Sequence, residues 1–288
     1  MSRLIKAELF KLRKRNMTWI LLYILMGILV LVYLLLFAIS KIQLPAGAPR
    51  DLTDIGTLLG LKSSIPFALE ILTSFGAVLS VILMASSVGN EYNWRTVRIA
   101  LISSESRFKF LSAKLISVAI AIFVGMLIGV AVGFLMSTIT TAIGGTGFDL
   151  SFATGSYLWD QFLQFWRTFF IILPFTLLGF LFAVVGRSAM PGIAVGIGIA
   201  FLEPIITALM RLAGGWVSSV PDYLFAANVN AISALNQLPR GFGGGQGFGG
   251  GSTTVLPSTT HAFVVLTIYI IVFIVIPFYL FRKRDVTG

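Results

Sequence analysis

Long apolar stretches alternate with short polar ones along most of this 288-residue chain. Each of six stretches has about the 20 apolar residues that an α-helix needs to cross the hydrocarbon core of a bilayer. The pattern predicts an all-α membrane protein that forms a single transmembrane domain over 1–288. The six predicted transmembrane helices cover about 17–39, 66–89, 115–139, 168–186, 188–210 and 262–281.

The segment 2–15, before the first span, has a helical pattern of its own. Leu9 and Leu12 fall on one face of a helix together with Glu8, and the opposite face is basic. This pattern predicts a short amphipathic helix in the headgroup region, with its basic face toward anionic lipid. The alternative is a simple cluster of charges that orients the first span. The apolar stretch that follows is too long for the apolar part of a signal peptide.

Lys and Arg are distributed unevenly between the two sets of loops. Fifteen lie on the side of the two termini, and six lie in the much longer loops on the other side. Because Lys and Arg near span ends resist translocation, this asymmetry predicts a multi-pass protein with both termini in the cytoplasm. It also explains the net charge of +10 by membrane orientation and anionic lipid headgroups, so we expect lipids and no nucleic acid as partners.

The composition narrows the possible chemistry. The chain is 57% hydrophobic and 11% charged, whereas soluble domains carry about 25% charged residues. It contains no cysteine and one histidine, which excludes disulfides, thiolate chemistry and metal sites built from Cys or several His. We therefore expect no catalytic residue and no metal site.

The predicted outer loops differ in composition. The loop 140–167 carries Trp159 and Trp166, which suit the aromatic belt at the membrane interface. Residues 212–232 are apolar but interrupted by Gly, Pro and Asp, which predicts a re-entrant outer segment before the last span. Residues 239–252 form a Gly-rich outer loop that we interpret as a flexible spacer.

Three acidic residues stand out against the apolar background. Glu203 lies inside the fifth span, where a carboxylate should face protein or water, and Pro204 beside it is expected to disrupt the helix. We interpret both as part of a translocation pathway or gate; a hydrated carboxyl near the outer interface is the alternative. The same two interpretations apply to Glu70, which lies early in the second span. Glu91 follows the second span and is placed to cap it or to pair with Arg95.

Glycines recur every four residues in the third span, at Gly125, Gly129 and Gly133. This spacing strips one helix face of side chains and permits close approach of another helix. Packing within the chain and a dimer interface are both compatible with the pattern.

The loop 90–114 connects the second and third spans and is strongly basic. Trp94 begins an apolar stripe on a predicted short helix, and Arg95 and Arg98 lie off that stripe. Ser104 is a favourable N-cap for a second helix that enters the third span. The pattern predicts a cytoplasmic elbow at the membrane surface, which is either a solvated loop or a docking element for a soluble partner.

This loop resembles the corresponding region of type-2 ABC-transporter permeases, in particular the small permeases of bacitracin, lantibiotic-immunity and sodium-export type. In that family the sequence reads approximately E-Y-x-x-G-T-x-R-x-L-L, then P-x-S-R and a Lys. The chain departs from it at Arg95, where the family has Gly, and at Glu105, near the family's Pro. The matching residues are Glu91, Tyr92, Thr96, Arg98, Leu101, Ser106, Arg107 and Lys114.

The resemblance implies the membrane subunit of an ATP-driven exporter in a prokaryotic cell membrane. Two such chains, identical or related, would form the pathway, and separate ABC ATPase subunits would bind ATP and Mg. The resemblance implies that substrate leaves between the second and fifth spans, with Glu203 and the re-entrant segment as the outer gate; Pro204 and Glu70 are the other candidate residues of the pathway or gate. The implied coupling helix docks the ATPase through Glu91, Trp94, Arg95, Thr96, Arg98, Glu105, Ser106 and Arg107.

Two other functions stay open at this point. The chain has no Walker motif, so it does not bind ATP by that route. One alternative is a secondary transporter or channel without an ATPase, which would be expected to have more ionisable residues in its spans and inverted repeats. A membrane scaffold that transports nothing is the other. The residues do not identify the transported substrate or distinguish a homodimer from a heterodimer.

Overall fold

The structure is a computed structural model that describes residues 1–42, 55–93, 107–144, 149–236 and 256–283. Within these ranges every regular element is a helix, and six helical segments are long and apolar enough to cross a membrane. The prediction of an all-α, multi-pass membrane protein is therefore confirmed. The elements are α1 (Ser2–Lys14), α2 (Asn16–Ser40), α4 (Ile55–Leu59), η1 (Leu61–Ser63), α5 (Ser64–Ile71), η2 (Leu72–Gly76), α6 (Ala77–Asn93), α8 (Arg107–Gly144), α9 (Gly155–Val185), α10 (Ala189–Ala213), η3 (Gly215–Tyr223), α11 (Phe225–Ser233) and α12 (Thr259–Lys283).

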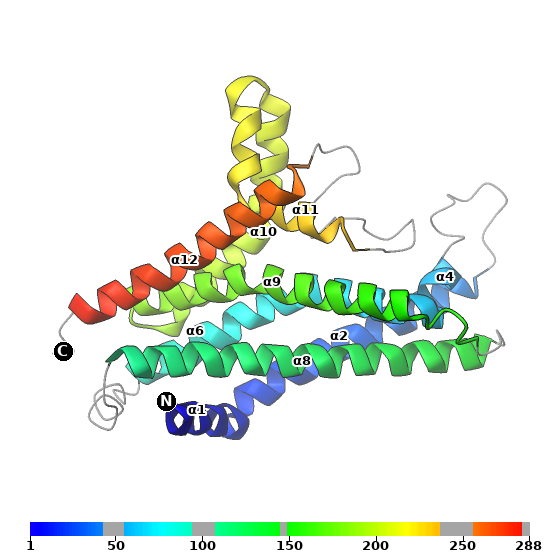
Figure 1. Ribbon diagram of the computed structural model, residues 1–288, viewed down its shortest axis with the longest axis horizontal. Coiled ribbons are helices and arrows are strands. Elements are labelled where there is room, and N and C mark those ends of the chain that lie inside the picture. Colours follow the sequence, from blue (N-terminus) through cyan, green and yellow to red (C-terminus); the bar gives the residue numbers. More distant parts are fainter. Residues whose placement is uncertain (43–54, 94–106, 145–148, 237–255, 284–288) are drawn as a thin grey trace.

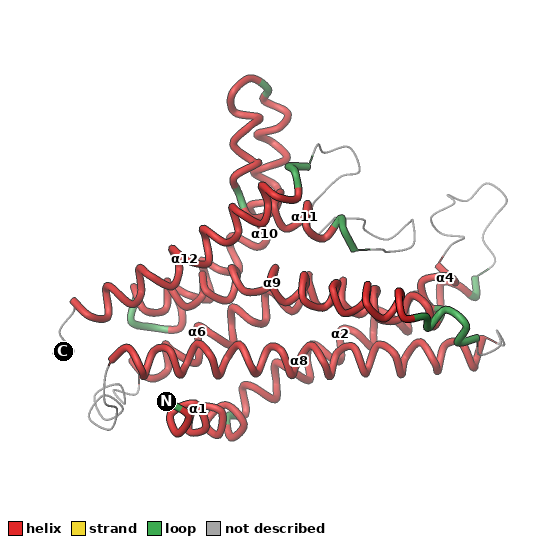
Figure 2. The backbone as a smooth tube through the Cα atoms, viewed as in Figure 1, coloured by secondary structure: helices red, strands yellow, loops and turns green. Residues whose placement is uncertain are grey.

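The spanning helices form one elongated bundle, shown in Figure 1. Helices α2, α6, α8 and α9 run roughly along the long axis, α12 leans across them, and α1 turns away at one end. The last part of α10 and η3 project from the bundle as a hairpin, which the tube in Figure 2 shows clearly. The second span is composite, because η1, α5, η2 and α6 follow one another without a break over Leu61–Tyr92.

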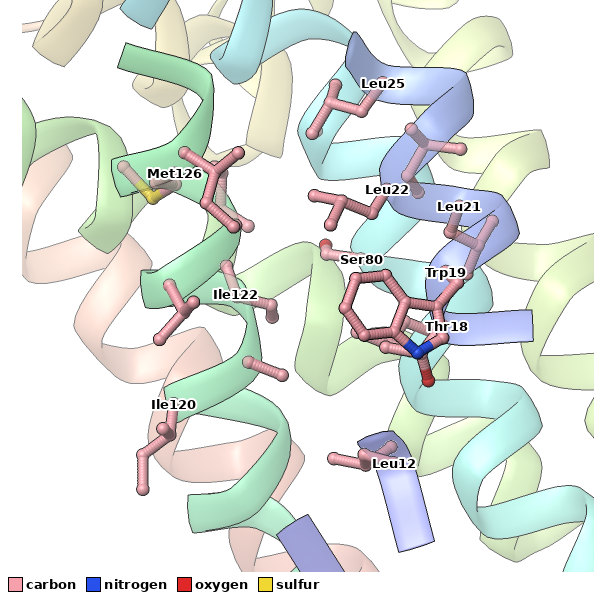
Figure 3. Close-up of a pocket in the computed structure, with 18 of the residues that line it drawn as sticks. Leu12, Thr18, Trp19, Leu21, Leu22, Leu25, Ser80, Ile120, Ile122 and Met126 are labelled. Atoms are coloured by element: carbon pink, nitrogen blue, oxygen red, sulfur yellow. The ribbon is translucent and has the colours of Figure 1, made fainter. Parts of the chain in front are cut away.

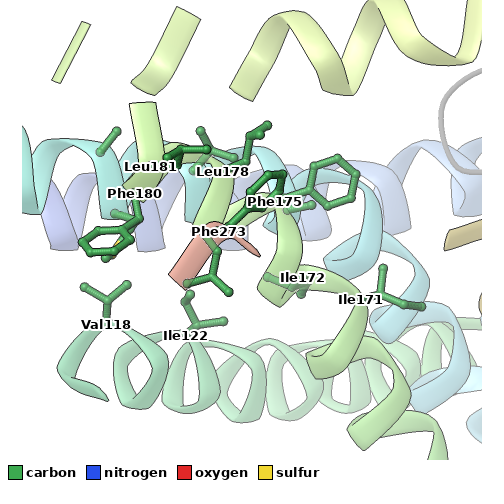
Figure 4. Close-up of a cluster of buried hydrophobic side chains, with 14 of the residues drawn as sticks. Val118, Ile122, Ile171, Ile172, Phe175, Leu178, Phe180, Leu181 and Phe273 are labelled. Carbon is green, nitrogen blue, oxygen red and sulfur yellow. The ribbon is translucent and has the colours of Figure 1, made fainter. Parts of the chain in front are cut away.

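Helix α9 is the centre of the bundle. In its most apolar stretch 72% of the residues are buried, against 17% in α10, so α9 is enclosed by protein while α10 faces outward. Its side chains Ile171, Phe175 and Leu178 belong to the main apolar cluster in Figure 4. Glycine allows its neighbours to come close: a Cβ at Gly179 would lie 2.9 Å from the carbonyl oxygen of Val81 in α6.

The fourth span begins earlier than predicted. We expected residues 140–167 to be a loop and the span to start at residue 168, but α9 begins at Gly155. Thr154 caps the helix by accepting a hydrogen bond from the backbone N–H of Tyr157 at 3.3 Å. Polar residues such as Asp160 and Arg167 lowered the local hydropathy without interrupting the helix, because hydropathy reports the environment and not helix formation.

The predicted helix break at Pro204 is wrong, because α10 is one α-helix from Ala189 to Ala213. A proline removes one backbone hydrogen bond and crowds the preceding turn, yet transmembrane helices tolerate it when neighbouring groups satisfy the freed carbonyl. Pro174 in α9 and Pro277 in α12 also lie inside unbroken helices.

The glycine stripe of α8 faces other helices of the same chain. A Cβ at Gly129 would lie 2.8 Å from the Leu72 side chain, and one at Gly133 would lie 2.5 Å from the Cβ of Ala68. At Gly125 the nearest atom of another element is Leu22 Cδ1, at 4.0 Å. At Gly129 and Gly133 the stripe therefore packs against η2 and α5 of the same chain.

Two of the segments singled out in the sequence lie outside the described residues: the elbow 94–106 and the Gly-rich loop 239–252. The segment 212–232 is described throughout; it contains the end of α10, the short helix η3 and most of the short helix α11.

Candidate functional site: a buried charge cluster beside the 94–106 segment

Most of the predicted docking residues lie in the segment that the structure does not describe. These are Trp94, Arg95, Thr96, Arg98, Glu105 and Ser106, and of Arg107 only the backbone, at the start of α8, is described. Glu91 is described in full. The structure thus shows the two helices between which the segment runs, α6 up to Asn93 and α8 from Arg107.

A cluster of charged side chains joins these two helices. Lys114 of α8 lies at its centre, and its Nζ is 2.9 Å from Glu91 Oε1 of α6 and 2.9 Å from Glu8 Oε2 of α1. Lys114 also donates a hydrogen bond to the backbone carbonyl of Ser87 at 3.1 Å. Lys11 of α1 pairs with both carboxylates and lies 3.4 Å from Glu91.

The cluster is buried, and its charges are balanced. Lys114 is 1% exposed, Glu91 3% and Glu8 5%, while the Lys11 side chain reaches the surface. The three protons of the Lys114 ammonium have three acceptors, so none is left unsatisfied. Among the described side chains, the ion pairs of the cluster join two cations and two anions. Removal of one partner would leave a buried charge uncompensated, which is far more costly than loss of an exposed ion pair.

The surroundings shift the proton affinities of the two groups on α1 in opposite directions. Burial by itself would raise the pKa of the Glu8 carboxyl, but the ammonium groups of Lys114 and Lys11 outweigh it and hold this pKa below its usual range. Burial would lower the pKa of Lys11, but the carboxylates of Glu8 and Glu91 outweigh it and raise this pKa. Both groups therefore stay charged near neutral pH.

The cluster fixes α1 against the bundle. The hydroxyl of Ser117 in α8 donates to the backbone carbonyl of Ile5 at 3.3 Å, and Leu12 of α1 is buried in the main apolar cluster. The predicted helix over residues 2–15 is thus present as α1, but one of its faces packs on α8.

Sequence reasoning missed this cluster, although part of its signal was visible. Glu8 falls on the apolar face of α1, and a carboxylate there needs a buried cation as its partner. From the sequence, Lys114 is expected to be one of the basic residues of the loop 90–114. In the structure it lies inside α8, on the same face as Phe110 and Val118. Nothing in the sequence indicates that these two residues meet.

A second polar site lies between α10 and the two short helices that follow it, η3 and α11. Glu203 accepts a hydrogen bond from the backbone N–H of Ala226 at 2.8 Å, in the first turn of α11. A carboxylate suits this position because a helix N-terminus has unsatisfied N–H groups and a positive dipole end. Asp222, in η3, pairs with Arg211 of α10 at 3.0 Å. These contacts hold η3 and α11 to α10.

Glu203 and Pro204 also line a small cavity of about 60 Å³ between the second and fifth spans. The opposite wall includes Thr73 and Ser74 of η2, a π-helical turn within the second span. Such turns are rare and occur frequently at functional sites. Glu70, in contrast, is not among the residues lining this cavity, and its Oε2 is buried without a hydrogen-bond partner among the described residues.

Comparison with known proteins places the chain in a family. Residues 57–287 match the family described as "Protein of unknown function (DUF2705)". The chain belongs to this family. The match to DUF2705 includes Glu91 and Lys114 but begins after α1 and α2, so Glu8 and Lys11 lie outside it. The chain is also 25% identical, over 226 residues, to "Uncharacterized protein YhcI" of Bacillus subtilis (strain 168); the alignment spans 75% of this chain and 66% of that protein.

Proposed function

We propose that this DUF2705 chain is the membrane-spanning permease subunit of an ATP-driven exporter of the type-2 ABC class. Two permease chains, identical or related, form the pathway in a prokaryotic cell membrane. Separate ATPase subunits bind and hydrolyse ATP with Mg, so this chain is not itself an enzyme. The segment 94–106 is the elbow on which an ATPase subunit docks.

The observation that carries this proposal is the charge cluster of Glu8, Lys11, Glu91 and Lys114. A docking element transmits force only if the helices on its two sides move together. Here Lys114 joins α6 to α8 through ion pairs and also to α1 through Glu8. Because separation of these charges leaves some of them buried and unpaired, the cluster resists relative sliding of the three helices. A push on the elbow then moves them as one unit.

The contacts around Glu203 support an outer gate in the same scheme. The small cavity beside η2 lies between the second and fifth spans, where we propose that substrate leaves. Glu203 holds the N-terminus of α11, so a movement of α10 carries η3 and α11 with it. In this proposal η3 and α11 are the re-entrant outer segment that closes the pathway.

The proposal includes an orientation. Both termini are cytoplasmic, and α1 lies on the inner headgroup region with its basic face toward the lipid. The elbow is then on the side of the membrane where ATP is available.

The deciding experiment is affinity purification of the chain co-expressed with a Walker-motif ATPase encoded beside its gene. We expect the ATPase to be retained by the wild type and lost from the double variant Arg98→Glu/Arg107→Glu. Lys62→Glu, an exposed charge reversal at the other end of the second span, is the matched control and should retain it. Equal retention by all three proteins would refute docking through the elbow.

A secondary transporter is the second candidate, because Glu70 is a buried carboxylate without a hydrogen-bond partner among the described residues of a span. Such groups mark proton and ion pathways in membranes. Under this alternative, the purified chain moves solute in vesicles that contain no ATPase and no nucleotide, and Glu70→Gln abolishes the movement. The permease proposal expects no movement under these conditions.

A further inference from the structure

A cavity that the proposed function does not use lies between α2 and α8, beside the junction of α1 and α2. Its volume is about 350 Å³, within the range of known small-molecule sites. Figure 3 shows Leu21, Leu22 and Leu25 of α2 on one side and Ile122 and Met126 of α8 on the other. Residues of η2 and α6 close the back of the cavity.

The cavity opens sideways to the exterior of the bundle. Ile120, Val124 and Ile128 of α8 line it, yet they are 37–46% exposed. Around a helix that crosses a membrane, this exterior is lipid. An acyl chain can therefore enter between α2 and α8 without crossing water.

One end of the cavity, at the junction of α1 and α2, is positively charged and polar, and Ser80 of α6 is a further polar residue in its lining. Arg13 is the one charged residue among the described residues that line it, and Thr18 and Trp19 lie beside it at the start of α2. The Thr18 hydroxyl oxygen is buried and has no hydrogen-bond partner among the described residues. The indole N–H of Trp19 donates to the backbone carbonyl of Arg13 at 2.8 Å, which fixes the backbone next to the cavity.

The exposed residues of α1 add to this positive charge. Arg3, Lys6 and Lys14 are exposed on the same short helix, whereas its single acid, Glu8, is neutralised in the charge cluster. An apolar cavity with a cationic, hydrogen-bonding end matches a molecule that has an apolar tail and an anionic head.

We propose that this cavity binds one anionic phospholipid from the leaflet that contains α1. An acyl chain occupies the space between α2 and α8, and the phosphate lies against Arg13 with the Thr18 hydroxyl within reach of the headgroup. The lipid thereby joins α1, α2 and α8 at a position that the charge cluster does not cover. This inference does not depend on the proposed transport function.

Glycine positions provide a clean way to fill the cavity. Gly125 lines it, and a Cβ there meets only Leu22 Cδ1, at 4.0 Å, so a leucine extends into the space without a backbone clash. Gly27 of α2 has nothing within 4 Å of its Cβ position and does not line the cavity. Gly27→Leu is therefore the matched control for Gly125→Leu.

The experiment uses Trp19 as the reporter. The full chain, with Trp94, Trp159, Trp166 and Trp216 replaced by Phe, is placed in phosphatidylcholine nanodiscs that contain a variable fraction of lipid brominated on its acyl chains. We expect brominated phosphatidylglycerol to half-saturate the quenching of Trp19 at about a fivefold lower mole fraction than brominated phosphatidylcholine, the preference typical of one cationic contact.

The variants separate the tail site from the head site. Gly125→Leu should reduce quenching by brominated phosphatidylglycerol to the level of phosphatidylcholine, and Gly27→Leu should leave it unchanged. Arg13→Gln should remove the preference for phosphatidylglycerol, and Lys62→Gln, an exposed position at the other end of the second span, should retain it. Equal quenching by the two lipids in the parent protein overturns the proposal, as does a preference that both Gly125→Leu and Arg13→Gln leave intact. Native mass spectrometry of each variant checks that it remains folded and counts its bound lipid.

Discussion

Individual ionisable residues decide how α1, α6 and α8 are held together at one end of this bundle. Lys114 is the residue on which the others depend, because its ammonium contacts carboxylates from two other helices and a backbone carbonyl. Its charge is compensated by Glu8 and Glu91, and theirs by Lys114 and Lys11. The intact cluster changes the free energy of folding little. Removal of one partner destabilises the folded state strongly, because it leaves a buried charge without compensation.

Lys114→Met should therefore destabilise the protein by about 3–5 kcal/mol, because it removes the buried ammonium that the carboxylates of Glu8 and Glu91 both contact. Thermal or denaturant unfolding in detergent measures the loss. Lys6→Met, at an exposed position of α1, is the control and should change stability by less than about 0.5 kcal/mol. The triple variant Glu8→Gln/Glu91→Gln/Lys114→Met should regain a large part of the loss. If it is less stable than Lys114→Met alone, the cluster does not act as an ionic unit.

The pKa shifts predict how stability depends on pH. The pKa of Glu8 is lower in the folded state, so its contribution is present above the usual pKa of 4.5 and is lost as pH falls through the folded value. The pKa of Lys11 is raised, so its contribution is present below 10.5 and is lost as pH rises through the folded value. The difference in melting temperature between wild type and Glu8→Gln should narrow below pH 4.5. The difference in melting temperature between wild type and Lys11→Met should become smaller above pH 10.5. Neither of the two differences should change between pH 6 and 9.

At the scale of whole helices, glycine residues determine how closely two helices can pack against each other. Helix α8 brings Gly129 and Gly133 against η2 and α5, and α9 brings Gly179 against α6. In a bilayer, where lipid is as apolar as leucine, such contacts stabilise a bundle through van der Waals packing. The spacing of the glycines was visible in the sequence, but their partners were not.

Gly133→Ala should destabilise the bundle by about 1–3 kcal/mol, because its Cβ would lie 2.5 Å from the Cβ of Ala68. Gly125→Ala, with 4.0 Å to its nearest neighbour, should be tolerated. Parallel unfolding measurements on the two variants test this contrast. If Gly133→Ala instead weakens association between chains and leaves the stability of each chain unchanged, the stripe serves a subunit interface.

At the scale of the whole molecule, the spanning helices differ in how much protein surrounds them. Helix α9 is enclosed, whereas α2, α10 and α12 each have less than a third of their most apolar stretch buried. A permease that pairs with a second chain needs such open helices, and so does any protein dissolved in lipid. The transport proposal therefore rests on the charge cluster and on the resemblance of the elbow, and its orientation requires a direct test.

The absence of cysteine makes that test simple. We expect Ser104→Cys to react with a membrane-impermeant maleimide only after the cells are permeabilised, because the elbow is predicted to be cytoplasmic. Ser252→Cys, in the predicted outer loop, should react in intact cells. The reverse pattern would place the elbow outside and remove the basis for ATPase docking.

Local sequence determined the class of this fold. Apolar length set the number of spans, and helices followed because a backbone in lipid must satisfy its hydrogen bonds within its own segment. Helical periodicity also placed Glu8 on the buried face of α1. These properties depend on short segments of the chain, so they can be predicted from the sequence without knowledge of the fold.

Tertiary structure alone decided which distant residues meet. Glu8 and Lys114 are 106 positions apart, and no local pattern pairs them. The same holds for Glu203 and the first turn of α11, for Gly133 and Ala68, and for the cavity between α2 and α8. Hydropathy and periodicity say which face of a helix is buried, whereas the identity of the neighbour depends on how all the helices pack at once.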